Sequence, residues 1–316
     1  MSKTEQKQGF GNISRRDFNR GVTSFTALSL TNPSEILRIA AQSFITETHV
    51  GRILSVDEIR EIVIDPLAFT EPPGGPRILT LQKDDGQYDH PNEIEMWNSC
   101  GPACCVMALK LMRFLETGKV PLLRIQDILN EFKGKSFRAD DKGKTCPYIR
   151  DDNLMSVQSV QVVLDYFAQE KDYPIKTDSI NVPTCGSDAN TTYPKRIPEL
   201  VSELNRKAFT KGGVVIGFIQ TNSYLHFTMF TDISIKRNEQ GKGQVEAFVV
   251  DPLGKDGKGR VGWVNFREYV DDIRRAGDMI NYKAYMSSIC VSPTFPIRNS
   301  SNNYAKPLIS KSFGRK

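Results

Sequence analysis

The feature that most constrains the fold is a cysteine followed by Gly-Pro at the start of a long apolar run. The motif Cys100-Gly101-Pro102 opens this run, and apolar residues then recur at helical spacing up to about residue 117. Proline is favoured in the first turn of a helix, because its missing N–H would have no partner there. We therefore predict a helix that is buried on a broad face over residues 100–117 and ends at Gly118.

This helix would place Cys100 at its N-terminus. The N–H groups and the positive end of the helix dipole favour the thiolate there, which is the nucleophilic form of cysteine. A cysteine before Gly-Pro can also be a small buried residue at a helix entry, since free cysteine usually behaves as an apolar core residue. The rest of the chain has to decide between the two interpretations.

A cysteine nucleophile needs a base, and the base needs an orienting partner. The chain has three histidines, His49, His90 and His226. His226 lies in the apolar, strand-like run 224–230, where a buried imidazole needs a hydrogen-bonding partner. A histidine in a strand is also a common core residue without a catalytic role.

The next strand-like run, 245–250, ends at Asp251 before Pro252 and Gly254. Aspartate is common at such turns for purely structural reasons. If the two strands are neighbours, however, the carboxylate of Asp251 lies at the same edge as His226. It could then hold the imidazole tautomer, as the third member of a catalytic triad does.

The expected helices precede most of the expected strands. Amphipathic or apolar periods predict helices at 34–43, 55–63, 100–117, 123–132, 157–167, 197–209 and 266–275, and strands at 77–82, 213–219, 224–233, 245–250 and 282–291. The segments 134–152 and 173–194 have no regular period and are expected to be loops. This order is typical of an α+β fold, with the first helix packed on an antiparallel sheet.

Four of these features, in this order, resemble the papain-like cysteine peptidases related to the bacteriocin double-glycine leader peptidases, in particular their stand-alone members. They are Gln82 after a strand, Cys100-Gly101-Pro102-Ala103 opening a helix, His226-Phe227 in a strand, and Asp251-Pro252-x-Gly254 at the end of the next. The resemblance covers residues 77–291. It implies a papain-like α+β fold, in which an N-terminal helical part with the nucleophile helix packs on a C-terminal antiparallel sheet.

The resemblance also implies the roles of the residues. Cys100 would be the nucleophile, His226 the general base and later acid, and Asp251 the orienting carboxylate. The implied reaction is hydrolysis of a peptide or amide bond through a thioester, on a peptide or protein substrate, without metal or organic cofactor. Trp263, Phe266 and the loops 173–194 and 255–260 are candidates for the substrate cleft, although a core position is the preferred expectation for Trp263.

An oxyanion hole needs hydrogen-bond donors aimed at the developing negative charge. The resemblance implies the side chain of Gln82 and the backbone N–H of Cys100. The loop between these two residues is longer than the family pattern, so Gln87 and Asn98 are alternatives to Gln82.

Two other functions share these residues. A γ-glutamyl-peptide transferase of the phytochelatin-synthase type has Cys, His and Asp in the same order. A catalytically inactive peptidase fold used for binding would also keep the architecture. The sequence leaves both open beside the cysteine peptidase.

The N-terminus carries Ser14-Arg15-Arg16-Asp17-Phe18 ahead of a mildly apolar segment, which resembles a twin-arginine export signal. The apolar segment is short, and no clean cleavage site follows it. We interpret 1–41 as this signal, with export as the expectation and a basic leader of a cytoplasmic protein as the alternative. The Pro/Gly run 71–76 is taken as a boundary, so that 42–76 is a helical pro-segment or linker, 77–292 the peptidase domain and 293–316 a polar, basic tail.

Composition excludes several classes of protein. The chain has 316 residues, of which 39% are hydrophobic and 25% charged, as in globular proteins, and no apolar run is long enough for a membrane span. The net charge of +5 comes largely from the ends, without a nucleic-acid-binding motif, so no nucleic-acid partner is expected.

The number and spacing of the cysteines argue against a disulfide scaffold and against a zinc site. Six cysteines are too few for a disulfide scaffold of this length. Cys146 and Cys185 could pair in an oxidising compartment. The group Cys100-x-x-x-Cys104-Cys105 lacks the second half of a zinc site, so no metal is expected.

Overall fold

The computed structural model describes residues 53–72, 75–81, 98–139, 143–181, 201–220, 225–237, 241, 243–254, 257–276 and 285–298. All of them belong to one compact unit, Ile45–Lys316. The predicted helix 34–43 and the twin-arginine motif lie outside the described residues. Within this part of the chain, no helix has the length and apolarity needed to cross a membrane.

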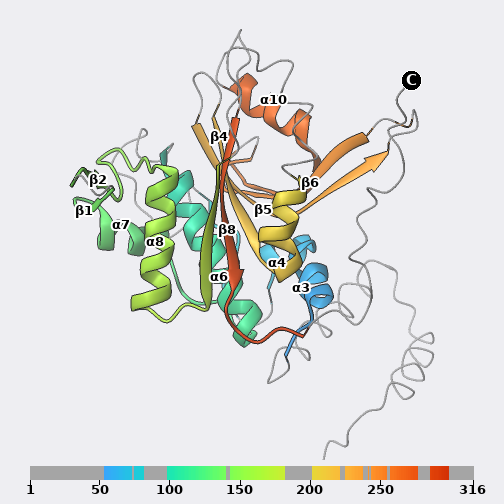
Figure 1. Cartoon of the computed structure of the whole chain (residues 1–316), viewed down its shortest axis with the longest axis horizontal. Coiled ribbons are helices and arrows are strands. Elements are labelled where there is room, and N and C mark those ends of the chain that lie inside the picture. The colour runs from blue at the N-terminus through green and yellow to red at the C-terminus, as the bar shows by residue number, and fades with distance from the viewer. Residues whose placement is uncertain are drawn as a thin grey trace, which may run out of the picture. The chain divides into compact units, whose positions relative to one another are not determined.

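A six-stranded antiparallel sheet forms the centre of the unit (Figure 1). Its spatial order is β3-β8-β4-β5-β6-β7, and each neighbouring pair is antiparallel. The strands are β3 (Ile175–Asn181), β4 (Val214–Gln220), β5 (Leu225–Arg237), β6 (Gly243–Asp251), β7 (Arg260–Asn265) and β8 (Tyr285–Pro293). The expected α+β class is confirmed.

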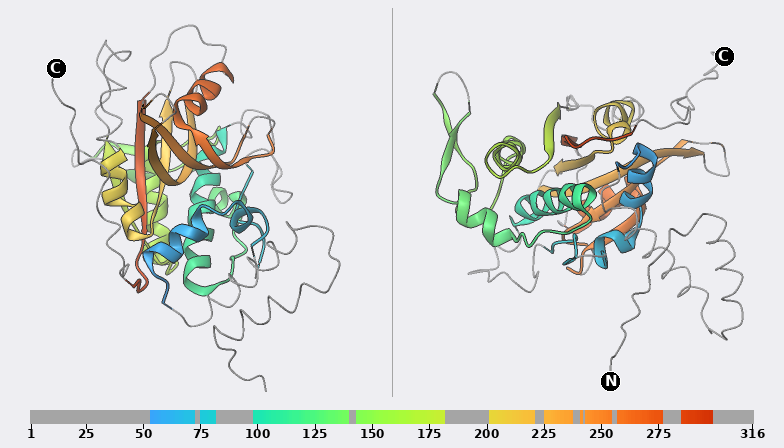
Figure 2. Two further views of the ribbon diagram at one scale, coloured as in Figure 1. Left: turned by 90° about the vertical axis from the view of Figure 1, so that its right-hand side faces the viewer. Right: turned by 90° about the horizontal axis from the view of Figure 1, so that it is seen from below.

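Helix α6 (Cys100–Thr117) packs against β4 and β5 on one face of the sheet. The helices α7 (Ile125–Phe132) and α8 (Val157–Glu170) pack against α6 in turn, and α8 also contacts β3 and β8 (Figure 2). Because neighbours surround α6, nearly all of its residues are buried, including Cys100. This explains why its apolar residues form a broad face rather than a narrow stripe.

The two ends of α6 follow local sequence rules. Gly118 has φ 70°, the left-handed conformation that glycine adopts at little cost, and its N–H donates to Phe114 O at 2.8 Å. At the other end, Ala103 N donates to Ser99 O at 3.0 Å. The predicted bounds of this helix are thus confirmed.

A second helical layer covers the opposite face of the sheet. It consists of residues 201–207, which are helical, and α10 (Phe266–Ala276). The apolar side chains of this layer, such as Leu204, Phe266 and Tyr269, pack with sheet residues such as Phe230 in a cluster separate from the α6 side. The sheet is therefore buried on both faces.

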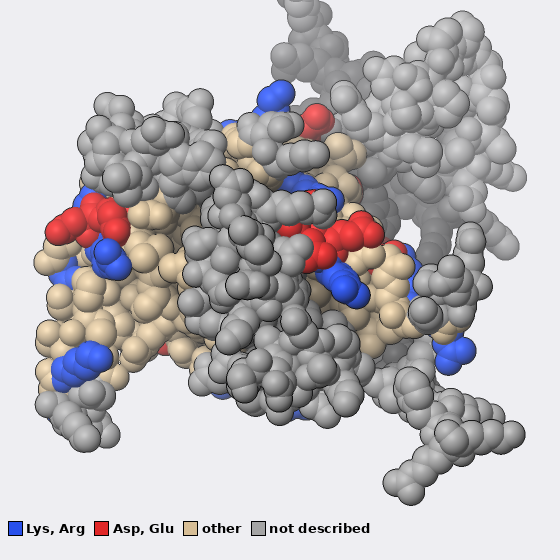
Figure 3. Space-filling model, turned by 90° about the horizontal axis from the view of Figure 1, so that it is seen from above, with Lys and Arg blue, Asp and Glu red and all other residues tan. Residues whose placement is uncertain are grey.

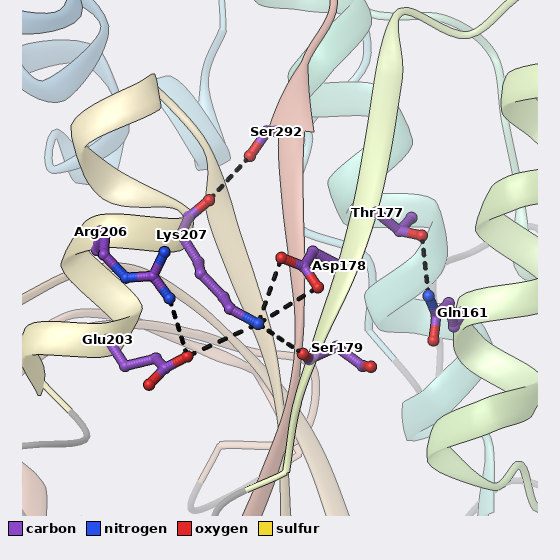
Figure 4. A network of polar contacts seen from close by, with 8 residues as sticks. All are labelled: Gln161, Thr177, Asp178, Ser179, Glu203, Arg206, Lys207 and Ser292. Atoms are coloured by element: carbon purple, nitrogen blue, oxygen red, sulfur yellow. Dashed lines mark hydrogen bonds and ion pairs between the residues drawn. The ribbon is translucent and has the colours of Figure 1, made fainter.

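Lys207 ties the helix at 201–207 to the edge of the sheet (Figure 4). Its ammonium group lies 3.3 Å from Asp178 Oδ2 and donates to Ser179 O at 3.1 Å, both on β3. The backbone carbonyl of Lys207 accepts from Ser292 Oγ of β8 at 3.3 Å. The Lys207 side chain is only 19% exposed, so this link is better shielded than an ordinary surface ion pair.

Helices α3 (Val56–Val63) and α4 (Pro66–Thr70) belong to the same core as α6. A capping box opens α3, because Glu58 N donates to Ser55 Oγ at 3.2 Å and Ser55 N donates to Glu58 Oε2 at 2.7 Å. Ile59 and Phe69 are fully buried. The Pro/Gly run 71–76 therefore connects two parts of one compact unit, and the structure does not divide at the boundary that composition suggested.

Helix α4 and strand β7 were not predicted, and three other segments differ from the expectations. Residues 75–81 contain no strand; instead Ile78 and Leu79 are buried, and Leu79 N donates to Phe69 O at 3.0 Å. The expected loop 134–152 holds the short hairpin β1 (Ser136–Arg138) and β2 (Thr145–Pro147). The expected loop 173–194 begins with strand β3, and its remainder, 182–194, lies outside the described residues.

Charged side chains of both signs are interspersed on the face shown in Figure 3. Blue and red side chains lie next to one another over the described surface in that view, and none of it is a large area of a single charge.

Candidate active site

Cys100, His226 and Asp251 meet at one end of the sheet. Cys100 is the first residue of α6, His226 lies at the start of β5, and Asp251 is the last residue of β6. Because β5 and β6 are antiparallel neighbours, the start of one lies beside the end of the other. The N-terminus of α6 reaches the same place, since Phe227 N donates to Cys100 Sγ at 3.5 Å.

The imidazole of His226 lies between the other two side chains. Its Nε2 is 2.8 Å from Asp251 Oδ1, and its side chain also hydrogen-bonds to that of Cys100. Since Nε2 faces the carboxylate, Nδ1 is the ring nitrogen left for the sulfur. The structure thus brings together the three residues that the sequence singled out.

All three side chains are almost completely removed from solvent. Cys100 is 2%, His226 1% and Asp251 4% exposed. A buried imidazole and a buried carboxylate are each costly unless they are paired. The short Nε2–Oδ1 contact provides that pairing, and low local polarity strengthens it.

The pKa of His226 reflects two opposing effects. Burial lowers it, because an imidazolium loses hydration, whereas the charge and hydrogen bond of Asp251 and the contact with Cys100 raise it. The raising effects prevail, and the pKa lies at about 10. His226 therefore carries a proton on both ring nitrogens at neutral pH.

Asp251 stays ionised for complementary reasons. Burial raises its pKa, but His226 and the backbone N–H groups of Leu253 and Gly254 lower it, and the net direction is downward. Leu253 N donates to Asp251 Oδ1 at 2.8 Å. A carboxylate that accepts backbone N–H bonds in addition to an imidazolium is strongly stabilised as the anion.

The turn after Asp251 requires glycine. Gly254 has φ 59°, and a Cβ at this position would lie 2.5 Å from the backbone of Gly259. The motif Asp251-Pro252-Leu253-Gly254 thus has a local explanation, because the tight turn supplies the two N–H groups that hold the carboxylate.

The turn at the start of α6 is also closely packed. Asn153, with φ 65°, donates from Nδ2 to Ser99 Oγ at 3.2 Å. A Cβ on Gly101 would lie 3.1 Å from Cβ of Met155. The glycine after Cys100 therefore lets residues 153–155 approach the backbone beside the sulfur.

The identity of the oxyanion side chain stays a prediction. Gln82 and Gln87 lie outside the described residues. Asn98 is described, lies two residues before Cys100 and is partly exposed. The backbone N–H of Cys100 lies in the first turn of α6, where N–H groups have no acceptor within the helix.

Two residues next to the triad were not found from the sequence. Tyr269 of α10 donates from its hydroxyl to Asp251 Oδ2 at 3.0 Å. Cys104 lies one turn into α6; its pKa is raised well above the usual value, first by burial and then by Cys100, Cys105 and Asp251. The only sequence signal for Tyr269 is its spacing of three from Phe266, on one face of an amphipathic helix.

The expected substrate-cleft residues behave differently from one another. Phe266 is 1% exposed and packs on Phe230 with 5.8 Å between the ring centroids, so it is a core residue. Trp263 is 40% exposed on β7, and therefore does not occupy the core position that its type suggested. Residues 182–194 of the first expected loop and residues 255–256 of the second lie outside the described residues.

Cys146 and Cys185 are the two cysteines that were expected to be able to pair. Cys146 of β2 is a partly exposed free thiol, while Cys185 lies outside the described residues, so their pairing stays a prediction. In the described ranges, no set of three or more His, Cys, Asp and Glu side chains could hold a metal ion.

Comparisons of the chain with models of known protein families, with curated proteins and with solved structures find no match. The likeness to papain-like peptidases consequently rests on the residues quoted above. The structure establishes a mixed α+β chain with a large antiparallel sheet.

Proposed function

We propose that the protein is a cysteine peptidase, which hydrolyses a peptide or amide bond through a thioester on Cys100. The observation that carries this proposal is the buried imidazole of His226, held between the Cys100 side chain and the Asp251 carboxylate. A nucleophile, a base and an orienter in hydrogen-bonding order are the signature of covalent catalysis.

The raised pKa of His226 supports a thiolate–imidazolium pair as the resting state. In this pair, the proton of the Cys100 thiol resides on His226 Nδ1, and Asp251 stabilises the resulting positive charge from the Nε2 side. The thiolate is the reactive form of cysteine, so the enzyme needs no further activation when substrate arrives.

Acylation would proceed in one sequence of bond changes. The Cys100 sulfur attacks the carbonyl carbon, and the backbone N–H of Cys100 stabilises the oxyanion. His226 then gives its proton to the leaving nitrogen as the C–N bond breaks, and the acyl group stays on sulfur as a thioester.

Deacylation would reverse the proton flow. Neutral His226 takes a proton from a water molecule as the oxygen of that water attacks the thioester carbon. The C–S bond breaks, the carboxylic acid leaves, and the thiolate–imidazolium pair is restored.

A labelling experiment tests the proposal. Alkylation by iodoacetamide near pH 6.5, followed by peptide mapping, should modify Cys100 faster than Cys146, the partly exposed thiol on β2. The fast labelling should be lost in Cys100→Ala and strongly slowed in His226→Ala, while a Cys146→Ser control keeps it. Equal rates for the two thiols, or no effect of His226→Ala, would contradict the proposal.

The products then separate hydrolysis from transfer. Incubation with a peptide library, read by mass spectrometry, should give cleavage products that require Cys100. A parallel incubation with glutathione tests the transferase alternative. If the protein joins glutathione units into longer thiol peptides and does not cleave the library, that alternative is correct.

A further inference from the structure

We propose that Tyr269 is a positioning residue of this site, which fixes the Asp251 carboxylate against His226 and thereby sets the reactivity of Cys100. The consequence for Cys100 rests on the proposed function, whereas the coupling between Tyr269 and His226 does not. The residue comes from α10, on the face of the sheet opposite α6.

The two oxygens of Asp251 have different donors. Oδ1 faces His226 Nε2 and accepts from Leu253 N, both at 2.8 Å, while Oδ2 accepts from the Tyr269 hydroxyl at 3.0 Å. Rotation of the carboxylate would break contacts on both sides. Tyr269 therefore restricts rotation of the carboxylate that would swing Oδ1 away from the imidazole.

The hydroxyl of Tyr269 is a donor and stays one. Burial and the nearby charge of Asp251 raise its pKa well above the usual value, so that it keeps its proton at neutral pH. A buried carboxylate oxygen that loses such a donor loses a charge-assisted hydrogen bond, which is stronger than a neutral one.

The ring of Tyr269 is held in place by its neighbours. The Thr228 hydroxyl of β5, which donates to Val250 O at 3.3 Å, also contacts the Tyr269 hydroxyl, and the Phe230 ring lies edge-on to the Tyr269 ring with 6.3 Å between the centroids. The guanidinium of Arg260, on β7, lies 5.9 Å from the ring centroid. Contacts with two strands, β5 and β7, thus fix the hydroxyl relative to Asp251, in addition to its hydrogen bond to the carboxylate.

The groups that influence the Asp251–His226 pair come from three elements. Cys100 and Cys104 face it from α6, Tyr269 faces it from α10, and the Arg260 side chain reaches the Tyr269 ring from β7. Arg260 also lies 3.8 Å from Asp272. A titration of His226 thus reports on its burial, on Cys100, and on Asp251 together with what holds that carboxylate.

The decisive variant is Tyr269→Phe, which keeps the ring and removes only the donor. The matched control is Tyr166→Phe, because the Tyr166 hydroxyl also donates to a carboxylate, Glu131 Oε1 at 3.1 Å, away from the triad. With three histidines in the chain, imidazole ¹⁵N resonances of selectively labelled protein can be assigned by comparison with His226→Ala.

We expect Tyr269→Phe to lower the midpoint of the His226 titration by about one pH unit, a tenfold change in its protonation equilibrium. Alkylation of Cys100 near neutral pH should slow about three- to tenfold. Tyr166→Phe should change neither curve. Unchanged curves in Tyr269→Phe, or equal shifts in both variants, would overturn the proposal.

A second variant covers the case in which Tyr269→Phe does not fold. Thr228→Val keeps the shape of the side chain and removes the hydroxyl that contacts Tyr269; it should shift the His226 titration in the same direction by a smaller amount. A folded Thr228→Val protein with a wild-type titration would refute the coupling. Because the titration needs no reactive thiol, it also distinguishes this proposal from the proposed function, which labelling of Cys100 tests.

Discussion

The pairing of His226 with Asp251 predicts how the stability of the protein depends on pH. The replacement Asp251→Asn keeps the size of the side chain and removes its charge. To observe the imidazole without the neighbouring sulfur, the comparison is made in the Cys100→Ala background. In the Cys100→Ala/Asp251→Asn protein, burial alone then acts on the pKa of His226, and burial lowers the pKa of an imidazole.

The sign and size of the effect follow from the pKa of His226. It is raised from 6.5 to about 10 in the folded protein, so the folded state binds one more proton than the unfolded state between these values. The free energy of unfolding therefore falls with rising pH by about 1.4 kcal/mol per pH unit in this interval. Over the whole interval, the free energy of unfolding falls by about 5 kcal/mol. This figure is an upper bound, because Cys100 contributes to the raised pKa of His226 and is absent from the Cys100→Ala background.

Urea unfolding of the two variants from pH 6.5 to pH 10 measures this difference. Other groups titrate in the same range, but they are common to both proteins and cancel in the comparison. The Cys100→Ala protein should lose its advantage over Cys100→Ala/Asp251→Asn steadily as the pH rises. A constant difference across the interval would refute the assignment of a charged imidazole to His226.

Three further predictions concern the surroundings of the site. Gly101→Ala places a methyl group 3.1 Å from Cβ of Met155, so it should lower the free energy of unfolding by about 1–3 kcal/mol in a urea titration and slow alkylation of Cys100. Gly254→Ala should abolish fast labelling, because its Cβ would lie 2.5 Å from the backbone of Gly259 and open the turn that holds Asp251. Deletion of residues 1–52 should leave a cooperative thermal transition, whereas deletion of 1–76 should remove it, since the longer deletion takes away buried residues of α3 and α4.

The parts of the fold that were predictable depend on local signals. Pro102 and Gly118 mark the two ends of α6, and both act through their own backbone geometry. His226 and Asp251 could be linked because β5 and β6 follow one another in the chain, and consecutive strands often pair. Their contact is thus almost a local property of the sequence.

The parts that were missed depend on distant partners. Strand β3 is at the edge of the sheet and pairs with β8, with Ile175 opposite Pro293, so its polar and mixed sequence has no period of its own. Tyr269 reaches Asp251 only because β7 returns the chain along β6 and α10 then turns over the sheet. Neither contact has a signature within a short window of residues.

Helix α3 connects the N-terminal part of the described chain to the strand that carries His226. Arg60 donates to the buried carboxylate of Asp232 at 2.7 Å, and Thr231 Oγ1 donates to Val63 O. Both hydrogen bonds lie where the pairing of β5 with β6 shifts its register. Asp232 is 2% exposed and would be a buried charge without this partner. Proteolytic removal of a segment up to residue 76 would therefore withdraw a structural support from β5, so a pro-segment that leaves a working site has to end before α3.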